Sequence, residues 1–329
     1  MSLSTVTVSA PCRLHFGLLS FGNVQGRRYG GVGVMVSRPG LRLQIEDDER
    51  LLCEGPLQSR VHQFVKAWVS WRPERRSPRC RIRIVTAPRQ HIGLGTGTQL
   101  GLAVAAGLNS FYGHDETSAC RLAESVGRGR RSAVGTHGFL CGGLIHERGK
   151  LESDRLSPLS QRIALPKDWR FVLLLPRHHV GLSGTSESNA FARAGTVSTN
   201  MTESLLHELH DHLLPAAKAR DFEAFSDSVY RYGYNAGKCF ANESENPFAS
   251  DVLACHIARM RAWGIRGVGQ SSWGPTLFGL FESEGAATRF IAEYSDLRQA
   301  RELEFVITPV NNEGARISGS VATKSITQV

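Results

Sequence analysis

A loop rich in glycine and threonine stands between an apparent strand and an apparent helix at residues 88–101, PRQHIGLGTGTQLG. Residues 81–85 alternate polar and apolar side chains, as a half-buried strand does, and residues 100–108 carry the small and apolar side chains of a tightly packed helix. The loop glycines lack a Cβ, so the backbone can approach an anion closely, and a helix N-terminus supplies free N–H groups and the positive end of its dipole. The segment therefore predicts a strand, loop and helix that bind phosphate.

Two common nucleotide motifs do not match this loop. No Gly-Lys-Ser/Thr closes it, as a Walker A motif requires, and its glycine spacing is not that of a dinucleotide-binding fold. A glycine-rich connector without a ligand is the alternative interpretation.

Composition narrows the class of partner. The chain has 329 residues, 41% of them hydrophobic, and a formal charge of +9, which favours an anionic partner. The arginines occur in scattered groups rather than in a basic stripe with interleaved aromatics, so we expect a phosphorylated metabolite and no nucleic acid. The seven cysteines are odd in number and form no CxxC pair, which argues against a disulfide framework or a structural zinc site and fits a reducing cytoplasm. We find no signal peptide and no apolar run long enough for a membrane helix.

The pattern of elements indicates two units and a tail. The first, residues 1–165, contains the phosphate loop, and a glycine-rich return follows at 135–143. The second, residues 166–310, opens on a continuous apolar run of strand length at 169–175. Residues 311–329 are polar and aperiodic, which predicts a flexible tail.

Further helices are expected where apolar residues repeat at helical spacing. Their positions are Val61, Phe64, Val65 and Trp68; residues 116–126; residues 205–214; Phe222, Phe225 and Val229; and residues 252–263.

Three segments together resemble the GHMP kinase superfamily. They are residues 10–17, APCRLHFG; the phosphate loop; and residues 267–276, GVGQSSWGPT. A kinase of this superfamily would show Gly-Leu-Gly-Ser-Ser-Ala in the loop, where this chain has GLGTGT at 93–98, and it would usually carry an Asp near the position of His137. The residues of the three segments are instead similar to those of the β-ribofuranosylaminobenzene 5′-phosphate synthases, a non-kinase branch of the superfamily.

The resemblance implies an α+β, GHMP-kinase-like fold of two domains. The N-terminal domain would be ribosomal-protein-like, of βαβ type, and the C-terminal domain ferredoxin-like, with the active site between them. It also implies an enzyme that joins phosphoribosyl pyrophosphate to 4-aminobenzoate or 4-hydroxybenzoate in methanopterin biosynthesis and releases pyrophosphate and carbon dioxide. Mg²⁺ would accompany the donor, no ATP would be used, and the protein would be a cytoplasmic homodimer.

This chemistry is compatible with the composition of the site. Loss of pyrophosphate creates oxocarbenium character at the anomeric carbon, and the electron-rich ring carbon that bears the carboxylate attacks it. Decarboxylation then restores aromaticity, so the leaving group's charge is the main electrostatic problem, which magnesium, backbone N–H groups and arginines can solve without a strong base.

Site residues follow from the three matching segments and their neighbours. The expected catalytic residues are Arg13, His15, His137 and Glu187. The expected binding residues are Gly93, Gly95, Thr96, Gly97, Thr98 and Gln99 of the loop; Arg27, Arg28 and Arg131; and Gly269, Gln270, Ser271, Ser272 and Trp273. Arg128 and Arg130 are further candidates, and Thr96, Thr98 or Glu187 could orient Mg²⁺.

Several alternatives stay open for single residues. His15 and His137 could be structural histidines, Trp273 could pack in the core, and Arg27 and Arg28 could be solvated. Glu187 could belong to a helix cap.

Two alternative functions remain at this point. One is a true ATP-dependent GHMP small-molecule kinase, acting on homoserine, mevalonate or a sugar. The other is a non-catalytic protein that binds a phosphorylated metabolite.

Overall fold

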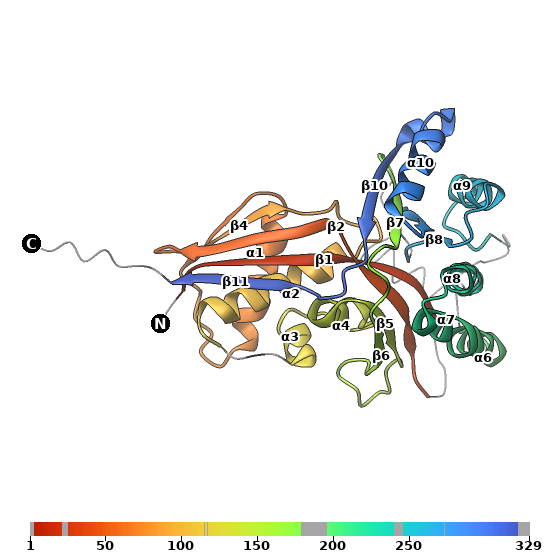
Figure 1. Cartoon of the computed structure of the whole chain (residues 1–329). Helices are drawn as coiled ribbons and strands as arrows, with labels where there is room; N and C mark the ends of the chain where they lie inside the picture. The colour runs from red at the N-terminus through yellow and green to blue at the C-terminus, as the bar shows by residue number, and fades with distance from the viewer. Residues whose placement is uncertain are drawn as a thin grey trace, which may run out of the picture.

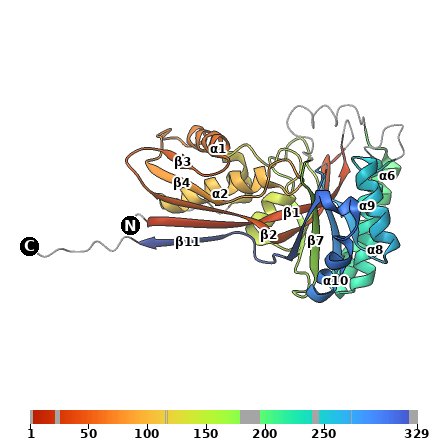
Figure 2. The same cartoon turned by 90° about the horizontal axis from the view of Figure 1, so that it is seen from above.

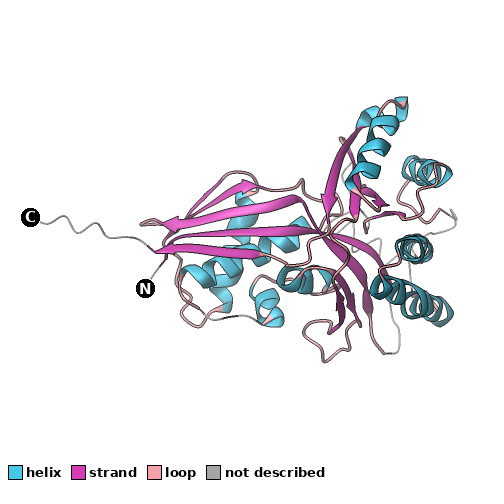
Figure 3. Ribbon diagram, viewed as in Figure 1, coloured by secondary structure: helices cyan, strands magenta, loops and turns pink. Residues whose placement is uncertain are grey.

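The chain folds around two β-sheets placed end to end, as the computed structural model shows (Figures 1 and 3). The structure describes residues 3–21, 26–114, 116, 118–178, 196–239, 246–272 and 274–321. Within these residues, no helix is both long and apolar enough to cross a membrane.

The first sheet has seven strands in the order β11-β1-β2-β4-β3, with β5 pairing to β2 and β6 to β5. The strands are β1 (Leu3–Ser20), β2 (Tyr29–Asp47), β3 (Leu52–Glu54), β4 (Cys80–Thr86), β5 (Leu144–Glu147), β6 (Leu159–Ile163) and β11 (Arg316–Val321). Strand β2 is long enough to pair with β4 along residues 42–47 and with β5 along residues 31–34. The sheet therefore branches, and β1 and β2 continue past the branch toward the second sheet.

Helices α1 (Gln58–Trp71), α2 (Thr96–Phe111), α3 (Ala119–Ser125) and α4 (Val134–Cys141) cover one face of this sheet (Figure 2). The buried residues of α1 are Val61, Phe64, Val65 and Trp68, the four that its spacing predicts. Helix α2 is buried along nearly its whole length because it lies between the sheet and helices α1, α3 and α4. Strand β3, helix α1 and strand β4 form a parallel βαβ unit of the expected kind.

The second sheet consists of β7 (Arg170–Pro176), β8 (Val268–Gln270), β9 (Leu277–Phe281) and β10 (Leu303–Pro309). Its order is β10-β7-β9-β8 with antiparallel neighbours throughout, which is the 4-1-3-2 order of a ferredoxin-like domain. Helices α6 (Thr199–His207), η1 (Glu208–Leu213), α7 (Leu214–Ala219), α8 (Phe222–Lys238) and α9 (Asp251–Ala262) connect β7 to β8. Helices α10 (Glu284–Tyr294) and η2 (Arg298–Glu302) connect β9 to β10. The expected α+β fold with a ferredoxin-like second domain is confirmed.

Strand β7 is buried on both faces. Phe171, Leu173 and Leu175 pack with β1 and α8, whereas Val172 and Leu174 pack with α9 and α10. Burial on both sides explains why its sequence is continuously apolar rather than alternating. The cluster on the β1 side contains buried residues of both units, so the two units pack against each other there.

The structure corrects two expectations. The predicted flexible tail is wrong for residues 316–321, which form β11 and pair with residues 3–9 of β1. The open edge of β1 binds this segment through backbone hydrogen bonds, which need no apolar pattern; residues 322–329 lie outside the described part. The glycine-rich return at 135–143 is largely helix α4, whose glycine Gly138 packs against Met35. The first sheet therefore contains strands from both ends of the chain. The expected domain boundary near residue 165 falls between β6 and β7.

Candidate active site

The three segments that carry the resemblance meet in space. The Ser271 Oγ donates to the carbonyl of Gly93 at 2.7 Å and accepts the backbone N–H of His15 at 3.0 Å, and the N–H of Ser272 donates to the carbonyl of His15 at 3.0 Å. A Cβ at Gly274 would lie 2.1 Å from the Gly93 nitrogen, so only glycine allows this close approach. Segments about 80 and 180 residues apart are thereby held as one site.

An arginine-rich cavity of about 270 Å³ lies at this meeting point. Its lining residues are Arg13, His15, Leu18, Thr98, Gly127, Arg128, Gly129, Arg130, Arg131, Ser132, Gly135 and Ser272. The lining includes four guanidinium groups and, in the described part of the chain, no acidic side chain. We call it the arginine cavity; its charge suits a ligand with several phosphate oxygens.

The cavity opens at the N-terminus of α2. Gly95 caps this helix with φ of 70°, in the left-handed region that favours glycine. Arg128 donates to Thr98 Oγ1 through Nη2 at 2.9 Å, and the Nε of Arg13 would lie 3.1 Å from a Cβ at Gly95. Two guanidinium groups therefore flank the positive end of the helix dipole, where an anion is stabilised.

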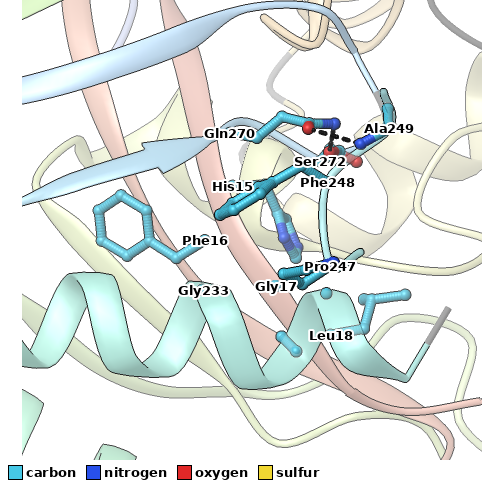
Figure 4. Close-up of a pocket in the computed structure, with 12 residues that line it drawn as sticks. His15, Phe16, Gly17, Leu18, Gly233, Pro247, Phe248, Ala249, Gln270 and Ser272 are labelled. Carbon is cyan, nitrogen blue, oxygen red and sulfur yellow. Dashed lines mark hydrogen bonds between the residues drawn. The ribbon is translucent and has the colours of Figure 1, made fainter. Parts of the chain in front are cut away.

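A smaller apolar pocket of about 60 Å³ adjoins the arginine cavity (Figure 4). Its lining residues are His15, Phe16, Gly17, Leu18, Gly233, Ala236, Gly237, Pro247, Phe248, Ala249, Gln270 and Ser272. His15, Leu18 and Ser272 line both hollows and form the wall between them. The site therefore combines a cationic compartment with an apolar one.

His15 is buried in this wall, and its Nε2 lies 3.0 Å from Ser132 Oγ. Burial, and then the charge of Arg13, hold the pKa of His15 well below its ordinary range. The imidazole is therefore neutral at physiological pH and can either donate or accept a hydrogen bond.

Behind Ser132 lies Glu147, a fully buried carboxylate at the end of β5. Its Oε2 accepts the backbone N–H of Ala133 at 2.7 Å, and its Oε1 makes no hydrogen bond within the described residues. Burial raises the pKa of Glu147, against the opposing effect of the nearby Ser132 and Ser157 hydroxyls. Sequence reasoning missed both Ser132 and Glu147, because a serine in a loop and a glutamate at a strand end carry no motif.

Several known proteins resemble this chain along most of its length, although no protein-family model matches it. A β-ribofuranosylphenol 5′-phosphate synthase from Methanothermobacter thermautotrophicus is 27% identical over 307 residues, covering 87% of this chain and 92% of that protein. Synthases of the same name from Archaeoglobus fulgidus and Methanocaldococcus jannaschii are 26% and 25% identical and cover 93% and 94% of this chain.

Along most of its length, the chain is similar to the β-ribofuranosylphenol 5′-phosphate synthases of these three organisms.

Solved structures share the fold of this chain. Homoserine kinase from Cytophaga hutchinsonii superposes with a TM-score of 0.68 at 15% identity and covers 96% of this chain and 98% of its own. Mevalonate diphosphate decarboxylase from Enterococcus faecalis has a TM-score of 0.66 at 13% identity, with 97% and 100% covered. At these identities the likeness shows the GHMP-kinase-like fold alone.

The structure brings several of the predicted site residues together. Arg13, His15, Thr98, Arg131 and Ser272 line the arginine cavity. Gln270 lines the apolar pocket, while Ser271 and Gly269 are buried beside it. Arg128 and Arg130, the further candidates, also line the arginine cavity.

Other predicted loop residues face the interior. Thr96 is buried and its hydroxyl donates to the carbonyl of Arg89 at 3.1 Å. Gln99 is buried and donates from Nε2 to the carbonyl of Gly135 at 2.8 Å. Neither side chain lines the arginine cavity or the apolar pocket, so their geometry favours holding the loop over touching phosphate. Gly97 lies in the first turn of α2, where a Cβ would meet Arg128 Nη2 at 3.3 Å.

The remaining predicted residues lie away from both hollows or outside the described part. His137 donates from Nε2 to the carbonyl of Ser157 at 2.8 Å, and burial lowers its pKa. Arg27 pairs with Asp154 at 2.8 Å, and Arg28 is held through backbone hydrogen bonds to Lys150. Glu187 and Trp273 lie outside the described residues.

The described side chains do not fit a protein-held magnesium ion. They contain no group of three His, Cys, Asp or Glu side chains able to hold a metal, and the arginine cavity repels a cation. Mg²⁺ prefers oxygen ligands and often uses substrate phosphates, so a magnesium ion would have to enter on the donor's own oxygens.

Proposed function

We propose that the protein is a decarboxylating phosphoribosyltransferase that joins phosphoribosyl pyrophosphate to a 4-substituted benzoate. The products are the β-ribofuranosyl arene 5′-phosphate, carbon dioxide and pyrophosphate. The observation that carries the proposal is the arginine cavity at the N-terminus of α2, which four guanidinium groups line. The similarity to the three synthases suggests the reaction type, and this cavity matches a donor that bears both a diphosphate and a monophosphate.

The arginine cavity would stabilise the pyrophosphate leaving group. The bond from the anomeric carbon to the diphosphate oxygen breaks, and its electron pair leaves with pyrophosphate. Arg13 and Arg128 flank the helix N-terminus and would stabilise the growing negative charge there. Because both arginines already line this space, little reorganisation is needed when the charge develops.

The acceptor step requires no proton removal from the ring. The ring carbon that bears the carboxylate forms the bond to the anomeric carbon, the bond to the carboxylate then breaks, and its electron pair restores aromaticity as carbon dioxide leaves. Neither hollow has an acidic side chain among its described lining residues, which is compatible with chemistry that uses no carboxylate base.

We propose 4-hydroxybenzoate as the preferred acceptor over 4-aminobenzoate. The names of the three relatives specify a ribofuranosylphenol product, and a phenol arises by this chemistry from the hydroxy acid. Use of Mg²⁺ with the donor, independence of ATP, a homodimeric state, a cytoplasmic location and a role in methanopterin biosynthesis remain parts of the proposal.

The kinase alternative has less support. Phosphoryl transfer to a small molecule normally needs carboxylates that hold metal ions beside the phosphates. The arginine cavity offers none among its described lining residues, and the kinases among the structural neighbours share only the fold.

The test is release of labelled carbon dioxide from carboxyl-labelled 4-hydroxybenzoate or 4-aminobenzoate, with Mg²⁺ and phosphoribosyl pyrophosphate. Release that depends on this donor and is not supported by ATP is expected, with the hydroxy acid giving the higher kcat/KM. Folded protein that releases no label from either acid would overturn the proposal. The kinase and the non-catalytic binding protein would then be the remaining alternatives.

A further inference from the structure

We infer that the apolar pocket beside His15 is the subsite for the acceptor's aromatic ring. The inference rests on the proposed function, which requires a planar aryl acid to meet the donor at its anomeric carbon. No charged side chain lines this pocket among the described residues, whereas the adjoining cavity holds four arginines. A phosphorylated sugar and an aromatic ring would therefore partition into different compartments on grounds of solvation alone.

The pocket is narrow because backbones form much of its wall. Gly17 of β1 faces α8 so closely that a Cβ there would lie 2.2 Å from the Cβ of Ala236. Leu18, Pro247 and Phe248 contribute apolar side chains around this contact (Figure 4). Walls of backbone and flat apolar groups suit a planar ring better than a branched ligand.

One polar side chain organises the rim of the pocket. Gln270 accepts the N–H of Ala249 at 3.0 Å through Oε1 and donates to the carbonyl of Ser272 at 3.1 Å through Nε2 (Figure 4). These two bonds connect the segment at 247–249 to the turn at 271–272. The pocket is thus held between β1, α8 and both of these segments.

The shared wall determines which end of the acceptor reacts. His15, Leu18 and Ser272 border both hollows, so a ring in the pocket can project its carboxylate-bearing carbon past them toward the donor. The volume of the apolar pocket is compatible with partial entry of the aromatic ring. A dry cavity of about 150 Å³ binds benzene, and this pocket measures about 60 Å³. The buried part is therefore the end that bears the 4-substituent, and the reacting carbon stays at the boundary.

Gly233 of α8 offers a direct test. It lines the pocket, and a Cβ there would meet one atom within 4 Å, the carbonyl oxygen of Phe16 at 3.4 Å. An alanine fits at ordinary contact distance and a valine fills more of the same space. Gly285→Ala on α10 is the matched control, because the nearest atom to a Cβ there is Arg289 Nη1 at 3.7 Å and Gly285 lines neither hollow.

The experiment measures steady-state kinetics and acceptor binding for wild type, Gly233→Ala, Gly233→Val and Gly285→Ala. Overfilling a packed site by a methyl or two costs enough to raise the acceptor KM by about tenfold in Gly233→Val. Gly233→Ala should give a smaller rise, while the donor KM stays within about twofold of wild type. Calorimetry with 4-hydroxybenzoate, with and without pyrophosphate, should show the same order of affinities. Gly285→Ala should match wild type throughout.

Different results would contradict the acceptor subsite and the transferase function. An active wild type whose Gly233 variants keep the acceptor KM and affinity, or lose donor and acceptor affinity equally, overturns the subsite while the transferase stands. A wild type that binds 4-hydroxybenzoate, loses that binding in Gly233→Val and releases no carbon dioxide overturns the transferase while the subsite stands. No binding of the acid under either calorimetric condition, and no turnover, overturns both. If Gly233→Val does not fold, the alanine variant decides the question.

Discussion

The imidazole of His15 on β1 and the hydroxyl of Ser132, two residues before α4, are joined by a 3.0 Å hydrogen bond, and both residues line the arginine cavity. The bond links two segments that are 117 residues apart. Because the pKa of His15 is held low by burial and by Arg13, this contact orients a neutral ring at the wall between the two hollows.

Ser132→Ala should therefore reduce turnover more than donor affinity. Loss of the hydroxyl leaves His15 Nε2 without this partner, and an unsatisfied buried group costs about 1–3 kcal/mol. We expect kcat to fall by about tenfold or more, with the donor KM within about twofold because the four arginines remain. Ser295→Ala, at the exposed end of α10, is the control. An unchanged kcat would remove the positioning role from this pair.

Arg128→Met should weaken donor binding. Arg128 donates to Thr98 Oγ1 at the N-terminus of α2 and faces the cavity. A hydrogen bond to a charged group contributes about 1.5–3 kcal/mol, which corresponds to a donor KM raised roughly ten- to a hundredfold. Arg128→Lys should recover only part of the loss, since an ammonium cannot bind phosphate in the bidentate way. Arg83→Met on β4, where Arg83 pairs with Glu54, should leave the donor KM unchanged.

Gly274→Ala should destabilise the whole protein. The new Cβ would lie 2.1 Å from the nitrogen and 2.2 Å from the Cα of Gly93, and neither backbone atom can rotate away. We expect a loss of more than about 2 kcal/mol in the free energy of unfolding, as forced overpacking produces. Chemical denaturation measures it. Gly285→Ala should stay close to wild type, and equal stability of the two variants would contradict the close approach of these segments.

His146 on β5 should make the wild type lose stability in acid. Its ring is buried against His210, its Nδ1 makes no hydrogen bond within the described residues, and burial lowers its pKa to about 4. In the unfolded chain the histidine takes up this proton near its ordinary pKa of 6.5, so the contribution of His146 is present above pH 6.5 and lost as pH falls toward 4. The loss is at most about 3 kcal/mol. Thermal unfolding from pH 7 to pH 4 should show a shallower decline for His146→Gln than for wild type; parallel declines would contradict the assignment.

Local sequence patterns predict most elements where packing and pattern agree. The spacing of Val61, Phe64, Val65 and Trp68 defines the buried face of α1 because a helix repeats every 3.6 residues wherever it lies. The apolar run at the start of the second unit predicts β7 because a strand buried on both faces has no polar side to display. The loop before α2 can also be predicted from the sequence, because its glycines and the flanking strand and helix are adjacent in the chain.

Elements stabilised by distant partners escape such reasoning. Strand β11 forms because the edge of β1 offers unpaired backbone groups. The residues at 316–321 carry no sequence pattern that indicates this pairing. Helix α4 forms from a glycine-rich segment because it packs against β1, β2 and α2. In both cases the stabilising contacts lie far away in the chain, so propensity alone gives the wrong answer.

The same distinction applies to the site. The sequence by itself determined that a phosphate-binding loop precedes a helix, that three separate motifs carry the resemblance to a synthase family, and that arginines are available nearby. Only the tertiary structure decided which side chains face the ligand space. It turned Thr96 and Gln99 inward, tied Arg27 to Asp154, and set Ser132 and the buried Glu147 behind His15. A motif is local, but the direction of a side chain depends on the hydrogen-bond partners and cavities that distant segments provide.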